Sequence, residues 1–582
     1  MTRTIRNFLS ALLATMSLGA WSANSQDLIY DINKTVGQDS VDAAGVFVTH
    51  RIPDGYDFNM SVARQFNASV NGSYIALYND RNWWGGNVNF GSFEFEDGHE
   101  IEISIASRRD ISSYEILPKT AEFEVTNTTS KGISLKISKA DQNLTIIINH
   151  PRTGNVLHLF CNSIDHNAPV ITSELDADNY CYDRATKTYY FGPGYHDLSK
   201  KFGGVVSAGG ARNIYLAAGA VLNGKLAISS GTEQTRIYGR GMIMNTSGQL
   251  VEVGYSQGGT VEGIIAHGHR TGWQTTITAS HDIHFKNVKI ISTEYASSDG
   301  IDVVNSHDCT FDSCFVRASD DCVAIKGLIG DNPAECMPNQ NLFFDHMQLW
   351  NDCNNGFGLG AETHAPYENI KLTNSDILFS YDDPGHHEEL DERAALNICC
   401  LHGTWFKDIL FENINVYHCE RLIGLGFKDS FWFGSLPGNQ SYEGGIQNVR
   451  FKNIRSWNES TSSIANDIWM YGWHQDGTPD KFVEDIWFDN VVVVDRLVES
   501  EQDVDIKTNN TASLTLVRNL HFNDNPVVRG DINGDGVVDV EDVNIAINTM
   551  LGKLSSSDNA DVTGDGVVDV DDINVLINIM LG

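Results

Sequence analysis

A degenerate six-residue pattern recurs through the middle of the chain and constrains the fold more than any other feature. It consists of an aliphatic residue, any residue, an aromatic residue or Leu, two polar residues and a final apolar residue. Its clearest copies are residues 283–288, 309–314, 342–347, 370–375, 409–414, 449–454 and 486–491. A strand with alternate side chains inward, followed by a polar corner and a second short strand, describes one coil of a parallel β-helix. The uneven spacing predicts variable loops on one face, which would wall a groove suited to a long polymer.

The corner of the repeat often carries Asn, as at Asn413, Asn453 and Asn490. We expect these residues to stack as an internal ladder that satisfies backbone groups otherwise buried without partners. A leucine-rich solenoid is excluded because the repeat has no Leu framework, and a propeller is disfavoured because each blade needs four strands. The sequence therefore predicts an all-β chain with a parallel β-helix over residues 185–525.

The N-terminus has the three parts of a secretory signal. Arg3 and Arg6 precede an apolar run from Phe8 to Trp21, and small residues follow. A transmembrane anchor is the alternative, but the run is shorter than the roughly 20 apolar residues that a span needs. We therefore predict a signal peptide over residues 1–25, no membrane span, and a secreted, extracellular protein that is held at a cell surface or in a multienzyme complex.

Residues 26–170 alternate apolar and polar positions, with turn residues between them, and this pattern predicts a β-sandwich domain. The chain has 10 cysteines. By position, Cys161 and Cys181 are the best candidates for a disulfide, although sequence alone does not fix the connectivity. Most of the others lie among the strand repeats, where buried thiols fit as well as disulfides.

The charge of the chain excludes one class of partner. A formal net charge of -36 argues against binding nucleic acid, because phosphates require neutralisation by Lys and Arg. An anionic membrane surface is disfavoured for the same reason. Acidic residues concentrate after Gly530, and this concentration predicts cation binding in the tail.

Three acids lie at equivalent turns of successive predicted coils. Asp299 precedes one repeat strand, and Asp320 and Asp321 follow the next short strand. Hydrolysis of a glycosidic bond needs one carboxyl to protonate the leaving oxygen and one carboxylate to activate water. Crowding raises the pKa of at least one acid and keeps a proton available near neutrality. A surface turn or a set of calcium ligands fits the same residues equally well.

Further residues are candidates to line the groove around the acids. Trp273 is placed to stack on a sugar ring, and Lys326, Glu362 and His364 are expected to bind hydroxyl groups. Structural roles compete with these assignments, such as a backbone hydrogen bond for Glu362. By contrast, His267 and His269 are expected to be solvated loop residues.

Residues 185–525 resemble the right-handed β-helix glycoside hydrolases, the group that contains polygalacturonases (family 28) and dextranases (family 49). Ser297-Ser-Asp-Gly300 resembles the Asn-Thr-Asp-Gly motif of polygalacturonases, and Ser319-Asp-Asp-Cys322 resembles their Asp-Asp motif. The resemblance implies that Asp320 is the general acid and that Asp299 and Asp321 position and deprotonate water. It also implies inversion at the anomeric carbon without a catalytic cofactor, with acid and base roughly 6.5–9.5 Å apart.

Departures from the polygalacturonase pattern concern the substrate. Gly356-Phe-Gly358 stands in place of Gly-His-Gly, and Ala395-Leu-Asn-Ile398 lies where Arg-Ile-Lys is expected. In the family, those basic residues grip the substrate's carboxylate. A neutral glucan or other neutral glycan is therefore favoured over galacturonan, and dextranase-like enzymes also carry an all-β domain ahead of the helix.

The tail contains two copies of a calcium-binding loop. Each has oxygen-bearing side chains at positions 1, 3, 5, 9 and 12, Gly at position 6, and a backbone carbonyl at position 7. The expected ligands are Asp531, Asn533, Asp535, Val537, Asp539 and Asp542 in the first loop, and Asp561, Thr563, Asp565, Val567, Asp569 and Asp572 in the second. Asp replaces the usual Glu at position 12, and a helical apolar pattern follows each loop.

Residues 529–582 therefore resemble a type I dockerin. The resemblance implies a small α-helical domain that folds with two Ca²⁺ ions and binds a cohesin domain of a scaffold or cell-surface protein. A calcium-stabilised tail without a partner is the alternative.

Three functions from different classes fit the whole chain. The first is an inverting glycoside hydrolase that acts on a polysaccharide. The second is a polysaccharide lyase on the same fold, which would need a Lys, Arg or Tyr base beside a uronate, and Lys326 keeps this alternative open. The third is a non-catalytic carbohydrate-binding protein, which would have no use for three acids at this spacing.

Overall fold

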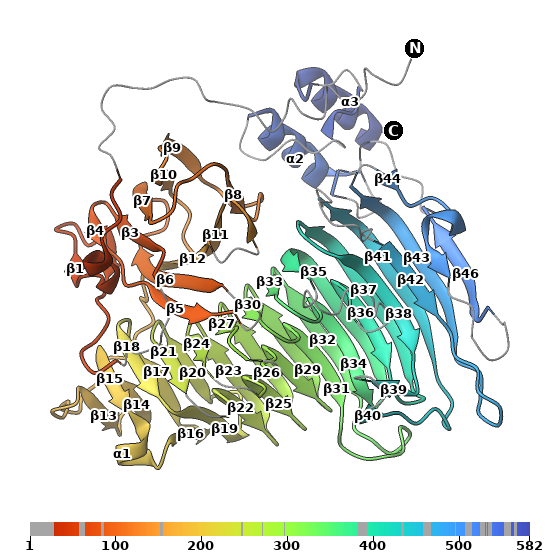
Figure 1. Ribbon diagram of the computed structural model, residues 1–582, viewed down its shortest axis with the longest axis horizontal. Coiled ribbons are helices and arrows are strands. Elements are labelled where there is room, and N and C mark those ends of the chain that lie inside the picture. The colour runs from red at the N-terminus through yellow and green to blue at the C-terminus, as the bar shows by residue number, and fades with distance from the viewer. Residues whose placement is uncertain are drawn as a thin grey trace.

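The computed structural model describes residues 28–56, 64–82, 86–151, 155–245, 248–269, 272–295, 297–381, 393–431, 436–457, 467–494, 496–506, 515–523, 530, 532–533, 538–551, 560–563 and 567–581. Three parts follow one another along the chain (Figure 1): a pair of small sheets, a long coil of parallel strands, and two helices at the end of that coil. The predicted signal peptide lies outside the described residues.

The first part is a sandwich of two mainly antiparallel sheets, as its alternating sequence predicts. One sheet contains β1 (Ser40–Val41), β2 (Phe47–Thr49), β5 (Tyr78–Arg81), β6 (Asn87–Phe95), β8 (Tyr114–Leu117), β11 (Gln142–Ile148) and β12 (Val156–Ser163), and the other contains β3 (Phe66–Val70), β4 (Ser73–Tyr74), β7 (Ile101–Ser107), β9 (Glu124–Thr128) and β10 (Gly132–Ile137). Apolar residues from both sheets, among them Phe66, Phe93 and Leu144, form one buried core.

The second part is a right-handed parallel β-helix whose coils each contribute strands to a larger and a smaller sheet. The larger sheet contains β13 (Tyr180–Asp183), β14 (Thr188–Phe191), β15 (Gly194–Asp197), β17 (Asn213–Leu216), β18 (Ala220–Asn223), β20 (Arg236–Gly239), β21 (Met242–Asn245), β23 (Gln257–Glu262), β24 (Ile265–Gly268), β26 (His281–Lys286), β27 (Lys289–Ser292), β29 (His307–Asp312), β30 (Phe315–Ala318), β32 (Asn339–Asp345), β33 (Gln348–Asn351), β35 (Tyr367–Ser380), β37 (Trp405–Val416), β41 (Gly445–Ser456), β43 (Phe482–Val493), β44 (Arg496–Leu497) and β46 (Val517–Phe522).

The smaller sheet contains β16 (Val205–Gly210), β19 (Lys225–Gly231), β22 (Val251–Gly254), β25 (Thr275–Thr278), β28 (Ile301–Val304), β31 (Val323–Gly327), β34 (Phe357–Thr363), β36 (Leu396–Cys400), β38 (Arg421–Phe427), β42 (Asp467–Tyr471) and β45 (Asp505–Ile506). A separate ribbon pairs β39 (Ser430–Phe431) with β40 (Leu436–Pro437), and the short helices are η2 (Ile32–Val36), α1 (Leu198–Phe202) and η4 (Glu501–Asp503).

The six-residue repeat is confirmed as the inward-facing framework of successive coils. Its aromatic position pairs Phe285 with Phe311 and Phe311 with Phe344 across neighbouring parallel strands. The rings stack with centroids 5.4 Å and 4.3 Å apart. The same column continues further along as Phe411, Phe451 and Phe488. The alternation that buries these rings leaves the residues between them at the surface.

The predicted asparagine ladder is present but is not internal. The side-chain amide of Asn453 donates to Asn413 at 2.9 Å, and that of Asn490 donates to Asn453 at 2.9 Å. All three residues have a positive φ, which Asn tolerates better than most residues, and all three are half-buried. The ladder therefore links side chain to side chain at an outer corner, where each residue also makes the left-handed turn.

The aromatic column supports a stability prediction. Phe311 is fully buried between two rings, so Phe311→Ala should lower the free energy of unfolding by about 3–5 kcal/mol. Denaturant unfolding followed by tryptophan fluorescence measures the effect. Phe343→Ala is the matched control, because Phe343 is half-buried on the outer side of the neighbouring strand β32. Equal losses in the two variants would contradict this account.

The sandwich packs directly on one face of the β-helix. Phe90 and Phe160 of the sandwich join Phe315 and Trp350 of the coils in one buried apolar cluster. Arg317 crosses this interface, since it binds Asp352 at 2.9 Å and donates to the His158 ring at 3.0 Å. These contacts fix the position of the sandwich relative to the β-helix.

The cysteine expectation is corrected by the structure. Cys161 and Cys181 are both free, so the candidate disulfide between them is wrong. Cys161 is a buried core residue of the sandwich, whereas Cys181 lies on the first strand of the β-helix. Cys309 and Cys314 are buried free thiols in the coil core, which is one of the two outcomes expected from the repeat.

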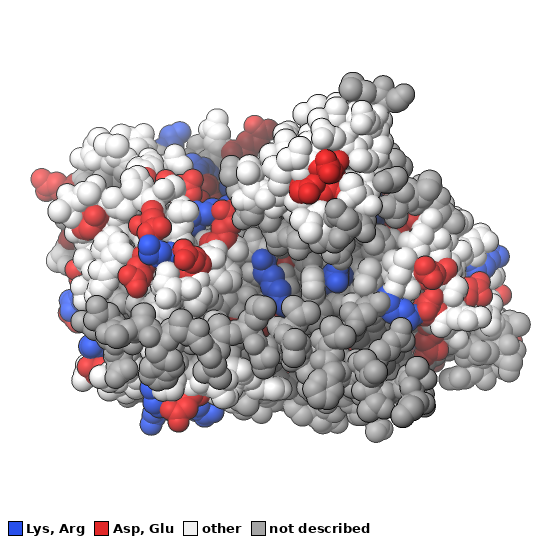
Figure 2. All heavy atoms as spheres, turned by 90° about the horizontal axis from the view of Figure 1, so that it is seen from above, with Lys and Arg blue, Asp and Glu red and all other residues white. Residues whose placement is uncertain are grey.

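The third part consists of α2 (Val540–Met550) and α3 (Val570–Leu581), which pack together around Ala546 and Leu576 near the last coils (Figure 1). No helix in the described ranges is long and apolar enough to cross a membrane. On the face shown in Figure 2, Lys and Arg are interspersed with Asp and Glu and form no continuous basic patch among the described residues.

Candidate active site

One corner of the β-helix, repeated over successive coils, positions the acids. Asp299 lies just before β28, and Asp320 and Asp321 lie just before β31, at the same corner of the next coil. Ladder hydrogen bonds align these turns, because the N–H of Gly300 donates to the carbonyl of Asp321 at 2.8 Å. The parallel stacking of coils therefore brings the three acids together, as their spacing predicts.

The acids line a pocket at this corner. Its lining residues are Trp273, Ser297, Asp299, Asp320, Asp321, Lys326, Asn354, Asn355, Gly358, Leu359, Gly360, Ala361, Glu362, Asn397 and Cys399. One oxygen from each of Asp299, Asp320 and Asp321 lies within 4.8 Å of the others. This separation is shorter than the roughly 6.5–9.5 Å expected for an inverting pair of carboxyl groups.

Burial and charge set the ionisation of Asp299. Its side chain is only 2% exposed, and its Oδ2 lies 3.2 Å from Nζ of Lys326. Burial raises the pKa of Asp299 to about 7, and Asp320 also raises this pKa, while the ammonium of Lys326 lowers it. Asp299 therefore exchanges its proton near neutrality.

Asp320 is the most exposed of the three acids, being half-buried. N–H groups surround its carboxylate: Ser297 donates to Oδ2 at 2.9 Å, and the Asp321 N–H donates to Oδ1 at 3.0 Å. The Asn354 amide donates to the same Oδ1 at 2.6 Å. These contacts fix the orientation of the Asp320 side chain in the pocket.

Residues of the following coils hold the Asp321 side chain in place through hydrogen bonds. Its Oδ1 accepts hydrogen bonds from both the backbone and the side-chain N–H of Asn355, at 3.1 Å and 2.8 Å. Asn355 is itself fixed by the amide of Asn397 at 2.9 Å. Burial, followed by the charges of Asp320 and Asp299, raises the pKa of Asp321 well above its usual value.

Lys326 is surrounded by acids. Its Nζ lies 3.2 Å from Asp299, 3.7 Å from Asp302 and 3.5 Å from Glu362, and it is 4.5 Å from the ring centroid of Trp273. Burial, then Asp299, raises the pKa of Asp302 well above its usual value. Trp273, Lys326 and Glu362 thus lie together in the pocket, as we expected.

His364 lies outside this pocket lining, contrary to the role expected for it. Its ring is hydrogen-bonded to the carbonyl of Gly330 and to the ring of His402, both at 2.7 Å. His364 comes directly after the end of β34, whereas Glu362 lies within that strand and lines the pocket. His267 and His269 are also corrected, since both are buried rather than solvated.

Sequence reasoning missed Asn354, Asn355, Asn397 and Asp302 as site residues. The first two occupy the corner of the coil after the acid pair, so the corner spacing that found the acids was the available signal. Phe357, where polygalacturonases have their histidine, is fully buried in the coil core beside Phe344. The pocket floor at this coil is instead formed by Gly358.

The position of Lys326 gives a prediction about pH. Its ammonium favours the ionised form of Asp299, so Lys326→Met should move the Asp299 ionisation from about 7 to higher pH. The inflection near neutrality in the pH dependence of kcat/KM should shift upward, while Lys371→Met on the outer surface should leave it unchanged. An unshifted inflection in a folded Lys326→Met variant would contradict the electrostatic account.

In each calcium-type loop, backbone N–H groups donate hydrogen bonds to the aspartate at position 12. Asp542 is fully buried and accepts N–H hydrogen bonds from Ile532, Asn533 and Asp539 at 2.6, 3.0 and 2.9 Å. Asp572 is equally buried and accepts from Thr563 and Asp569, both at 2.8 Å.

The oxygen-bearing groups of both loops are a donor set that suits calcium. Asn533, Asp539 and Asp542 of the first loop, and Asp561, Thr563, Val567, Asp569 and Asp572 of the second, are in the described part of the chain. Asp531, Asp535, Val537 and Asp565 lie outside it.

Two family sequence profiles match the chain. The profile of glycosyl hydrolases family 28 matches residues 240–376, a segment that includes all three acids. The profile of the dockerin type I domain matches residues 529–581. No curated protein sequence matches the chain at a significant level.

Several solved structures are similar to this chain, and the first of those named here shares its fold. Dex49A from Penicillium minioluteum is 12% identical, with 81% of this chain and 98% of that chain covered and a TM-score of 0.51. The family 28 exopolygalacturonase of Yersinia enterocolitica is 10% identical, with 73% and 97% covered and a TM-score of 0.40. A GH87 alpha-1,3-glucanase catalytic domain in complex with nigerose is 12% identical, with 77% and 88% covered and a TM-score of 0.32.

Proposed function

We propose that this chain, a right-handed β-helix glycoside hydrolase with a family 28 domain and a type I dockerin domain, is exported and hydrolyses a neutral polysaccharide with inversion. Its dockerin tethers it to a cohesin-bearing scaffold or cell-surface protein. The observation that carries the catalytic part is the convergence of Asp299, Asp320 and Asp321 within 4.8 Å in one pocket.

A neutral substrate is supported by the surroundings of Lys326, which is the only cation among the described residues that line the pocket. Lys326 already faces Asp299, Asp302 and Glu362, so it has no uncompensated charge to offer a uronate carboxylate. A uronate in this pocket would meet an excess of negative charge. The Trp273 ring, which has Nζ of Lys326 over one face, also lines the pocket and adds apolar surface for a neutral sugar.

The roles of the acids follow from their exposure. Asp320 is the least buried of the three and lines the pocket, where it can donate a proton to the leaving glycosidic oxygen. Asp299 and Asp321 lie deeper, where they can hold a water molecule and accept its proton. Under this assignment, kcat/KM rises as pH increases through about 7, because Asp299 must ionise. A fall over the same range would make Asp299 the donor instead.

Inversion is supported by the chemistry of the buried acids, although the carboxyl groups are closer than the general spacing for inverting enzymes. A retaining mechanism needs a carboxylate that first attacks the sugar and then leaves it. Burial raises the pKa of Asp299 and Asp321, which makes each a better proton acceptor and a poorer leaving group. Both are therefore better suited to activating water than to forming a covalent intermediate.

A substrate panel tests the proposal. Purified full-length protein is incubated with dextran, pullulan, algal galactan and polygalacturonate, and new reducing ends are measured against an Asp320→Asn blank. We expect reducing ends from at least one neutral glycan and none from polygalacturonate. Release from polygalacturonate alone would overturn the neutral-substrate assignment.

The lyase alternative is tested in the same reactions. A lyase creates an unsaturated sugar, which absorbs in the ultraviolet, whereas hydrolysis creates none. We expect reducing ends without new absorbance.

Export is tested separately by sequencing the N-terminus of protein recovered from the culture medium. This sequence should begin near residue 26 if residues 1–25 are removed.

A further inference from the structure

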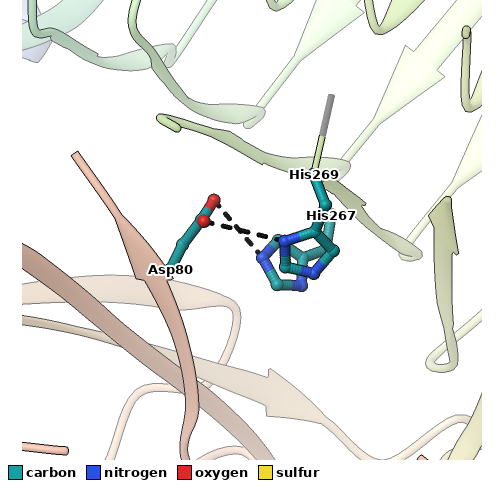
Figure 3. A group of neighbouring side chains, drawn as sticks. All are labelled: Asp80, His267 and His269. Carbon is teal, nitrogen blue, oxygen red and sulfur yellow. Dashed lines mark ion pairs between the residues drawn. The ribbon is translucent and has the colours of Figure 1, made fainter. Parts of the chain in front are cut away.

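A second cluster of potential metal ligands lies away from the acid pocket, at the junction of the sandwich and the β-helix. Asp80 comes from β5 of the sandwich, His267 comes from β24 of the β-helix, and His269 directly follows β24 (Figure 3). One ligand atom from each of these residues lies within 4.8 Å of the others. The catalytic proposal makes no use of this trio.

The three side chains are buried, and most of their facing atoms have no hydrogen bond; the exception is Oδ1 of Asp80, which accepts from the N–H of Arg81 at 2.8 Å. Asp80, His267 and His269 are 1%, 0% and 3% exposed. None of the four imidazole nitrogens, nor Oδ2 of Asp80, has a hydrogen-bond partner among the described residues. A buried polar atom left in this state destabilises the fold, because its hydrogen bonds to water are lost and not replaced. A ligand that satisfies several of them at once would remove this destabilisation.

The spacing of the facing atoms fits a metal ion. Nε2 of His267 lies 3.4 Å from Oδ2 of Asp80, and Nδ1 of His269 lies 3.7 Å from Oδ1 of Asp80. Atoms bound at about 2.0–2.1 Å around a tetrahedral zinc ion lie about 3.3 Å apart. Figure 3 shows both imidazole rings turned toward the Asp80 carboxylate from the opposite side of the junction.

The surroundings of the cluster exclude water. The ring of Phe90 packs against His267 with centroids 4.7 Å apart.

We propose that Asp80, His267 and His269 bind one divalent transition-metal ion, zinc in the first instance, which clamps the sandwich to the β-helix. Two histidines and one carboxylate are a common nitrogen and oxygen set for zinc. The site is structural and takes no part in the hydrolytic step.

A different Asp–His cluster provides the matched control. Asp312, Asp345 and His346 are also close enough to hold an ion, but they are more exposed. His346 is already hydrogen-bonded to Asp345 at 2.6 Å, and Asp345 also accepts from Asn374 at 2.9 Å. Because these groups have partners within the protein, we assign no ion to them.

The test uses full-length protein saturated with calcium, so that the tail loops do not compete for the probe. After treatment with a zinc-selective chelator, Zn²⁺ is added and binding is measured by titration calorimetry and elemental analysis. We expect one tightly bound zinc per chain and an upward shift of the thermal midpoint by several degrees. Asp80→Asn should weaken zinc binding by more than about a hundredfold, since even changes beyond the ligands cost 10–100-fold. Asp345→Asn should bind zinc as the wild type does.

Anomalous diffraction at the zinc edge from wild-type crystals decides the case if Asp80→Asn fails to fold. A peak between Asp80 and the two histidine rings supports the proposal. Absence of zinc from the wild type, equal zinc binding in folded Asp80→Asn, or a peak only at other residues overturns it.

Discussion

Asp320→Asn is expected to reduce kcat by about 10²–10⁴-fold, the contribution typical of one positioned acid–base group, while leaving the fold intact. The amide keeps the shape of the carboxyl group and one acceptor for the surrounding N–H groups, but it has no proton to give to the leaving oxygen. Initial rates on the best neutral glycan from the panel measure the loss. Asp299→Asn and Asp321→Asn should be similarly inactive, because each removes a group that holds or deprotonates water.

Two controls show whether the loss of activity is specific to the Asp320 carboxyl group. Asp331→Asn changes an exposed acid on the loop after β31 and should retain wild-type rates. Circular dichroism and the thermal midpoint of Asp320→Asn should match the wild type, because Asp320 is half-buried at a corner rather than in the core. Undiminished turnover in Asp320→Asn would remove it from the catalytic assignment.

Calcium removal is expected to unfold the tail and abolish binding to a type I cohesin. The two loops bring many carboxylates together, and without a cation these repel one another. Only a small core around Ala546 and Leu576 then remains to hold α2 and α3 together. A calcium-selective chelator should reduce the helical signal and eliminate cohesin pull-down, and added calcium should restore both. Hydrolysis of a soluble glycan should continue, because the acid pocket lies in the β-helix.

Neighbouring aspartates in the second loop provide the matched pair for this prediction. Asp572 is buried and accepts backbone hydrogen bonds from Thr563 and Asp569, whereas Asp571 is exposed beside it. Asp572→Asn should weaken calcium binding and cohesin capture, and Asp571→Asn should preserve both. Cohesin capture that persists in the presence of chelator would count against a calcium-dependent dockerin.

The sequence predicted the coil framework and the acids because both depend on local spacing. Alternation within a strand fixes which residues face inward, so the column through Phe311 and Phe344 follows from the repeat. A constant corner position then places Asp299 beside Asp320 and Asp321 once the coils stack. Neither inference requires knowledge of the loops.

The remaining site residues depend on contacts that spacing does not encode. Asn355 and Asn397 reach Asp321 through a chain of side-chain hydrogen bonds between coils. His364 follows Glu362 closely in sequence but is hydrogen-bonded to the ring of His402, a residue 38 positions further along the chain. His267 and His269 are buried because the sandwich covers their face of the β-helix, and a repeat pattern contains no information about that docking.

The configuration of the first product tests the central claim most directly. Proton NMR spectra recorded within the first minutes of wild-type hydrolysis of a neutral glycan identify the anomer released, before it equilibrates in water. Water activation by the buried acids, with Asp320 as the proton donor, predicts a sugar whose anomeric configuration is inverted relative to the cleaved linkage. A retained configuration, or an unsaturated product, would contradict it.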